Sequence, residues 1–156
     1  MVGGDELRAV MRRFPAGVAV VTVDVGGQPV GLTVASLVSL SLEPPLVGVA
    51  VRRDAALHEL LREADEFAVN LLAEGQDDLA QHFARGVPPI ALWERIALRA
   101  SDGPPELDGA LGWLRCRRLD EHPTGDHTFF VGTVESAELG TATRPLIFHG
   151  QSYVAL

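Results

Sequence analysis

The sequence predicts a mainly β fold, a small antiparallel β-barrel decorated with short helices. Short strand-like runs outnumber short helical runs along the 156 residues. Turn residues separate many of these runs, whereas a doubly wound sheet would alternate its strands with helices of about ten or more residues. Because the chain shows no internal repeat, low-complexity tract or linker, we expect a single domain over residues 1–156.

The chain begins with a predicted helix and a β-hairpin. Four apolar residues recur at the spacing of an amphipathic helix over 5–14, and Pro15 then ends this helix. The two adjacent glycines of DVGGQP favour a tight turn between strands at 17–23 and 29–36. The apolar residues of the helix are Leu7, Val10, Met11 and Phe14.

The elements after the hairpin are a third strand, a helix, a fourth strand and a second short helix. The strands are expected at 46–51 and 67–72, and the last helix at 77–84. Asp54 offers an N-cap for the helix that starts with AALHELL.

The last third of the chain is predicted to be β-rich after a long loop. Two Pro-Pro pairs between Arg85 and Gly112 indicate mostly loop around Trp93. Three more strands follow in GWLRCRRL, TFFVGTVESAEL and PLIFH, and the turn HPTGDH separates the first two.

Charge and cysteine usage narrow the class of protein. The 13 Lys and Arg against 21 Asp and Glu give a net charge of −8, so the surface repels nucleic acid and anionic lipid. The N-terminus MVGGDELRAV lacks a secretory pattern, and the apolar runs are too short to span a bilayer. Cys116 is the only cysteine, which suits a reducing compartment. We therefore expect a cytoplasmic protein that binds neither nucleic acid nor membranes.

Several well-known chemical motifs are absent. The chain has no GxGxxG, GxxxxGK or GxSxG, so the phosphate cradles and the hydrolase elbow that they build are not expected. Its five histidines show no HExxH or HxH grouping, and a lone cysteine cannot form a thiolate cage. No metal site is predicted.

Hydroxyl groups accumulate in one stretch, GLTVASLVSLSLEPPL, residues 31–46. A buried hydroxyl costs free energy unless it is hydrogen-bonded, so water, neighbouring backbone or a ligand must supply partners. ST-turns explain any single serine, but four hydroxyls within nine residues favour a ligand such as a planar heterocycle with an amide and imide edge. The four residues are Thr33, Ser36, Ser39 and Ser41.

Two further features carry a functional and a structural interpretation. VRRDAALHELL joins Arg52 and Arg53 to a helix N-terminus, which suits a phosphate but also a solvated basic turn. His127 follows a glycine turn at the start of a strand, although a lone histidine commonly has a surface or structural role. Phe83, Trp93 and Tyr153 suit core or interface positions.

The order of these pieces resembles the flavin reductase family, the small FMN-binding split-barrel reductases with a Greek-key-like barrel that serve two-component flavin monooxygenases. The resemblance runs from about Glu6 to Tyr153. It rests on FPAGVAVVTV, GLTVASLVSLSLEPPLVGVAV, FAVNLL with DLAQHFA, GDHTFFVGTVE and PLIFHGQSY, taken in that order.

The resemblance implies an NAD(P)H:flavin oxidoreductase that reduces FMN or FAD and supplies it to a separate flavin-dependent monooxygenase. It also implies a homodimer with flavin sites near the interface, and it places His127 where nicotinamide stacks. NADH and NADPH stay open as donors. The flavin-contacting positions that it implies are Thr33, Val34, Ala35, Ser36, Ser39 and Ser41 near the ring, Val51, Arg52, Arg53, Asp54 and Ala55 near the ribityl phosphate, and Phe83 and Tyr153 near the pocket.

The sequence also departs from the family pattern. Many relatives carry Ser or Asn at Ala35, Phe and Thr at Leu37 and Val38, and a hydroxyl pair where this chain has Asp54, Ala55 and Ala56. Fewer hydroxyls and one more carboxylate imply weak phosphate anchoring, so we expect flavin to exchange as a substrate. A flavoprotein that retains its flavin and acts on another substrate, or a non-catalytic flavin carrier, is the alternative.

Overall fold

The computed structural model describes residues 1–85 and 88–156. Among these residues the fold is mainly β, which confirms the predicted class, and every strand pairing is antiparallel. The described residues contain no helix that is long and apolar enough to cross a bilayer.

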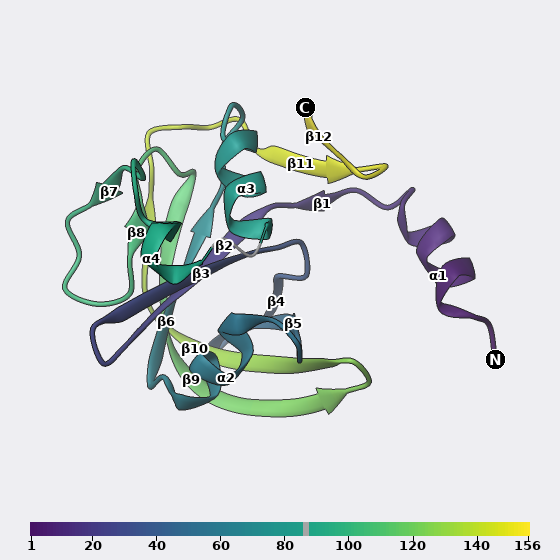
Figure 1. The fold of residues 1–156 in the computed structure, drawn as a ribbon, viewed down its shortest axis with the longest axis horizontal. Coiled ribbons are helices and arrows are strands. Elements are labelled where there is room, and N and C mark those ends of the chain that lie inside the picture. The colour runs from purple at the N-terminus through teal and green to yellow at the C-terminus, as the bar shows by residue number, and fades with distance from the viewer. Residues whose placement is uncertain (86–87) are drawn as a thin grey trace.

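Seven strands of the described chain form one large sheet, in the order β3-β2-β6-β9-β10-β5-β4 (Figure 1). Alternating or continuous apolar residues with β-branched valines suit these strands. The glycine turn predicted at 24–29 joins the first two, with Gly26 and Gly27 both at positive φ. The strands are β2 (Ala19–Val25), β3 (Gln28–Val34), β4 (Val38–Leu42), β5 (Pro45–Arg52), β6 (Glu66–Leu71), β9 (Gly112–Thr124) and β10 (His127–Leu139).

The hydroxyl-rich stretch crosses from one edge of this sheet to the other. Strand β3 is the outermost strand on one side and β4 is the outermost on the other, and only residues 35–37 separate them in sequence. Strand β4 pairs with β5 as far as Gly48, so β4 does not cover the later residues of β5. The Ser36 hydroxyl donates to the Ala50 carbonyl at 2.9 Å and accepts from the Ala50 N–H at 3.1 Å. One serine thus fastens the β3 side of the sheet to the uncovered part of β5.

Helices α2 (Ala56–Glu63) and α3 (Asp77–Ala84) lie on the sheet. The Thr33 hydroxyl donates to the Ala80 carbonyl at 2.6 Å, which ties α3 to β3. A Cβ at Gly31 would lie 2.9 Å from the Phe83 ring, so a glycine is required where α3 approaches the strand. The predicted Asp54 cap was wrong: Ala55 is the N-cap of α2 and makes no side-chain cap hydrogen bond.

A buried polar chain attaches α2 to the start of β10. His58 Nε2 lies 2.7 Å from the hydroxyl of Thr128, and His58 Nδ1 lies 2.9 Å from a carboxylate oxygen of Glu59. Since a carboxylate only accepts, Nδ1 carries a proton, and in the neutral ring Nε2 accepts from Thr128. His58 and Thr128 are both buried, and the His58 ring meets Phe130 edge-on.

The first helix stands apart from this body. Helix α1 (Gly4–Met11) is shorter than predicted and leads through residues 12–15 into β1 (Ala16–Gly17), and Figure 1 shows it beyond the end of that strand. The residue after the helix, Arg12, accepts a 3.0 Å hydrogen bond at its carbonyl from the Gly150 N–H. All four residues of its predicted apolar face, Leu7, Val10, Met11 and Phe14, are exposed.

The predicted loop between Arg85 and Gly112 contains short elements, and residues 86–87 of it lie outside the described residues. These elements are α4 (Pro89–Leu92) and the paired β7 (Leu98–Arg99) and β8 (Glu106–Leu107). Trp93 is half-buried and donates its indole N–H to the Pro29 carbonyl at 2.8 Å. Near the C-terminus, β11 (Leu146–His149) pairs with β1 and with β12 (Ser152–Ala155), a strand that was not predicted.

Glycine at position 132 is required by close packing between β10 and β6. A Cβ there would lie 2.6 Å from the ring of fully buried Phe67 and 3.1 Å from the Cβ of Cys116. Gly132→Ala is expected to lower the free energy of unfolding by about 1–3 kcal/mol through overpacking. Urea denaturation measures this, and Gly17→Ala, where no atom lies within 4 Å, is the matched control. Equal midpoints for the two variants would contradict the packing argument.

The His58–Thr128 hydrogen bond predicts a second stability effect. Thr128→Val removes the donor and leaves His58 Nε2 buried without it, which costs about 1–3 kcal/mol. Thr133→Val on the same strand is the control, because Thr133 is half-buried. Equilibrium unfolding should show a lower midpoint for Thr128→Val only; a matching loss in Thr133→Val would point to general hydroxyl removal.

Candidate functional site

A hollow opens where the two ends of the large sheet come together, between β3 and the uncovered part of β5. We call it the β3–β5 hollow, and its volume is about 370 Å³. The N-cap of α2, the end of α3 and the start of β10 complete its wall. Its lining residues are Leu32, Thr33, Val34, Ala35, Ser36, Ala50, Val51, Arg52, Ala55, Ala84 and His127.

The β3 side of the hollow combines a free strand edge with apolar side chains. Because β3 pairs only with β2 within the described sheet, alternate residues turn their backbone N–H and C=O groups away from that partner. The Thr33 and Ser36 hydroxyls already donate to Ala80 and Ala50, so they reach a ligand only as acceptors. This wall can therefore offer backbone donors and acceptors beside apolar surface.

An arginine fork lies at the end of β5. Arg52 Nε and Nη2 donate to the two carboxylate oxygens of Asp54 at 3.0 and 2.8 Å. This pairing raises the pKa of Arg52 and lowers that of Asp54, mainly through the side-chain hydrogen bond, so both groups are charged at neutral pH. The hollow thus has a cation at one end, already paired with an internal anion.

His127 is the first residue of β10, directly opposite Arg52 of β5 in the strand register. Its Nδ1 lies 2.6 Å from a carboxylate oxygen of exposed Asp126. The hydrogen bond lowers the pKa of Asp126, and the ionised carboxylate requires Nδ1 to carry a proton. In the neutral ring Nε2 is then an acceptor, available to a ligand.

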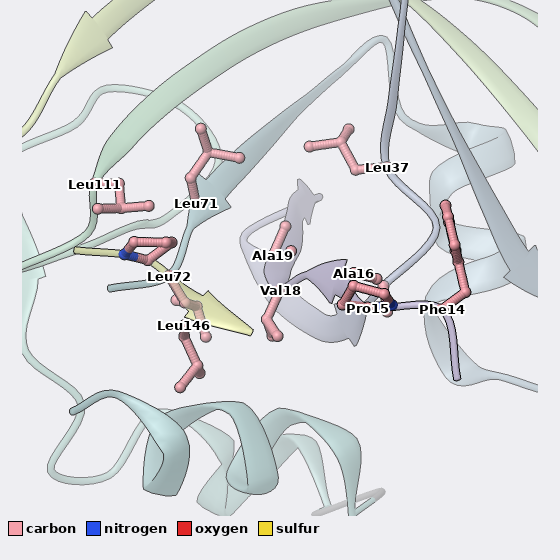
Figure 2. Close-up of a pocket in the computed structure, with 13 residues that line it drawn as sticks. Phe14, Pro15, Ala16, Val18, Ala19, Leu37, Leu71, Leu72, Leu111 and Leu146 are labelled. Atoms are coloured by element: carbon pink, nitrogen blue, oxygen red, sulfur yellow. The ribbon is translucent and has the colours of Figure 1, made fainter. Parts of the chain in front are cut away.

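Two other cavities border this site. A second hollow of about 450 Å³ shares Leu32, Arg52, Ala55 and Ala84 with the first and is lined in addition by Phe83 and Asp54. On the other side of residues 35–37 lies an apolar cavity of about 350 Å³, which shares Ala35. Figure 2 shows its side chains, among them Leu37, Phe14, Leu71 and Leu146.

The structure brings most of the predicted site residues to these neighbouring hollows. Eight of them line the β3–β5 hollow: Thr33, Val34, Ala35, Ser36, Val51, Arg52, Ala55 and His127.

The other predicted residues lie around or away from this hollow. Asp54 and the buried Phe83 line the second hollow, while Ser39 and Ser41 lie on β4 and do not line the first. Arg53 donates its backbone N–H to the Asp126 carbonyl at 3.1 Å. Tyr153 lies on β12, where its ring packs against Phe148.

Sequence reasoning missed three lining residues and one partner. Leu32 and Ala50 were recoverable, since Leu32 alternates with Val34 and Ala50 lies in a predicted strand. Asp126 was also recoverable, because it is the sequence neighbour of His127, whereas Ala84 enters through the approach of α3 to β3, which no local pattern encodes. The described residues contain no group of three or more His, Cys, Asp or Glu that could hold a metal ion.

Known proteins resemble this chain over nearly its whole length. A model of the flavin reductase like domain matches residues 11–156. The reductase component of 4-hydroxyphenylacetate 3-monooxygenase from Thermus thermophilus is 41% identical over 149 residues, 96% of this chain and 94% of that protein. An NADH:FMN oxidoreductase of Rhodococcus qingshengii is 38% identical over 95% of this chain and 79% of its own length.

Solved structures of flavin reductases also resemble this chain. The NADH:FAD oxidoreductase SgcE6 of Streptomyces globisporus superposes with a TM-score of 0.92 at 35% identity, covering 100% of this chain and 96% of that chain. BorF, the flavin reductase component of a bacterial two-component tryptophan halogenase, has a TM-score of 0.89 at 36% identity, covering 99% and 98%. The sequence match over residues 11–156 and these structural similarities show that the chain belongs to the flavin reductase family.

Proposed function

We propose that the β3–β5 hollow holds the flavin of an NAD(P)H-dependent flavin reductase. The observation that carries this proposal is the convergence, in one hollow, of a free β-strand edge, an arginine and a histidine from separate parts of the chain. Relatives whose printed names are NADH:FMN oxidoreductase and NADH-dependent FAD reductase support the activity.

The residues present fit a flavin. The outer edge of β3 suits the amide and imide edge of an isoalloxazine, and Val34, Ala35 and Val51 offer apolar contact to its ring. Arg52 and the N-terminal end of α2, at Ala55, suit the phosphate of FMN or FAD. When bound, the flavin accepts a hydride from nicotinamide, a reaction that the two cofactors supply without a protein nucleophile.

His127 is proposed to orient the nicotinamide. Asp126 holds its Nδ1–H, which leaves Nε2 to accept a hydrogen bond from a carboxamide N–H or from the flavin. The protein has to position the nicotinamide ring against the flavin ring, because hydride transfer depends on close and aligned contact between them. No proton transfer by this histidine is needed.

The partner of the reaction is proposed from the relatives. The Thermus protein and the resorcinol hydroxylase reductase of a Rhizobium strain are reductase components of two-component monooxygenases. We infer that this chain likewise supplies reduced flavin to a separate flavin-dependent monooxygenase.

The buried free thiol of Cys116 supports a cytoplasmic location.

A homodimer is proposed from exposed apolar surface. The apolar residues of α1 and those of the edge strand β4 are exposed in the isolated chain, and apolar surface of this kind marks interaction sites. A second copy would cover them. The exposed residues are Leu7, Val10, Met11 and Phe14 on α1 and the segment after it, and Val38, Leu40 and Leu42 on β4.

The reductase activity is tested by steady-state oxidation of NADH and NADPH with FMN, FAD and riboflavin as acceptors. We expect turnover that saturates with free flavin, followed by the loss of the absorbance of reduced nicotinamide. Retention of stoichiometric flavin through dialysis, with no turnover of added flavin, would instead support the flavoprotein alternative. Flavin binding without NAD(P)H oxidation would support a carrier.

Replacement of His127 separates positioning from folding. His127→Ala should raise the KM for NAD(P)H by roughly three- to tenfold, the effect of one lost hydrogen bond, with an unchanged unfolding midpoint. His122→Ala is the control, because His122 lies on the same hairpin beside Asp120 and does not line the hollow. Unchanged kinetics in His127→Ala would remove this residue from the site.

Oligomeric state tests the exposed α1 face. Light scattering after size exclusion should give the mass of two chains for the natural protein, and Met11→Glu should shift it toward 16.7 kDa, the mass of one chain. Ala9→Glu places the same charge on the opposite face of α1 and should leave the mass unchanged. A natural protein of one-chain mass would refute the dimer.

A further inference from the structure

Asp54 occupies the Nε/Nη2 fork of Arg52, one of the two edges through which an arginine can bind a phosphate bidentately. Arginine presents Nε–H and Nη–H in a rigid fork that matches two oxygens of a carboxylate or of a phosphate equally well. In this chain both of those donors are engaged by Asp54, at 3.0 and 2.8 Å. A flavin phosphate that binds Arg52 through this fork must therefore displace the carboxylate.

Within the described residues, the side chain of Asp54 forms hydrogen bonds only with Arg52. A carboxylate before a helix ordinarily caps the first turn, but Asp54 does not cap α2. Its side chain is 70% exposed and lines only the second hollow, whereas Arg52 lines both hollows. The other ionisable groups near this rim are Arg53, whose backbone N–H donates to the Asp126 carbonyl, and Asp126 and His127, which pair with each other.

We propose that Asp54 is an internal competitor for the flavin phosphate, which weakens binding at Arg52 and keeps the flavin exchangeable. This inference rests on the proposed function. Because Asp54 is two residues from Arg52 in the same chain, it re-forms the pair as soon as the phosphate leaves. The competition acts on phosphorylated flavins alone, since riboflavin carries no group for the fork.

The test compares FMN with riboflavin in the natural protein and in Asp54→Asn. Fluorescence titration gives both Kd values, and their ratio, riboflavin over FMN, isolates the phosphate contribution. We expect Asp54→Asn to tighten FMN by roughly three- to tenfold, the range for an exposed ion pair together with removal of a nearby like charge. Stopped-flow displacement should show slower FMN release by a similar factor, with riboflavin release unchanged.

Asp126→Asn is the matched control. It removes the same charge from the same rim but leaves the Arg52–Asp54 fork in place, so it should raise the ratio of the two Kd values less than Asp54→Asn does. An equal rise of the ratio in both variants would overturn the proposal, because general charge removal would then be the cause.

The outcomes also separate this inference from the proposed function. If the natural protein binds both flavins but Asp54→Asn leaves the ratio unchanged or lowers it, the competitor role fails and the reductase proposal stands. If the natural protein binds none of FMN, FAD and riboflavin, both proposals fail. A larger rise of the ratio and slower FMN release in Asp54→Asn than in Asp126→Asn support the inference.

Discussion

The bond between the Ser36 hydroxyl and the backbone of Ala50 is the interaction on which the site depends. Beyond Gly48, β4 no longer covers β5, and backbone groups at such an edge need partners. Ser36 supplies one donor and one acceptor, so a side chain does at Ala50 what a neighbouring strand does elsewhere. This contact holds the two ends of the sheet together at Ser36 and Ala50, and the two ends stay apart next to it. The β3–β5 hollow is the space that this arrangement leaves, with unpaired β3 edge on one side and the end of β5 on the other.

The charges around the hollow follow from the same arrangement. The whole chain carries a net charge of −8, which disfavours anionic ligands at a distance. Pairing of β10 with β5 sets His127 opposite Arg52, and the Gly125 turn brings Asp126 with it. Two groups at the rim are thus matched by carboxylates, Arg52 by Asp54 and His127 by Asp126, while Arg53 lies beside them in sequence. Because the net charge is negative, binding of a phosphate at this rim depends on local geometry. A site whose cation is already paired with a carboxylate suits a ligand that binds reversibly.

Periodicity and turn chemistry predicted most of the elements, and tertiary contacts account for what they missed. The hairpin at Gly26 and Gly27 and the helix at 77–84 were found because their signals are local. The hydroxyls of the 33–41 stretch raised the right question, yet Thr33 and Ser36 bind protein backbone in α3 and β5, which are distant in sequence. The Asp54 cap failed because a nearby arginine offered a bidentate partner, and a propensity rule cannot weigh that competition. The glycine turn and the family resemblance both predicted His127 as a site residue, and the structure places it in the wall of the hollow.

The most direct test of the account is a crystal structure of the protein soaked with FMN. The account predicts the isoalloxazine edge against the backbone of residues 33–36, with one ring face open beside His127 and the phosphate close to Arg52. Flavin bound in the apolar cavity beyond Leu37 or at another surface, with the β3–β5 hollow closed by the protein's own side chains, would contradict it.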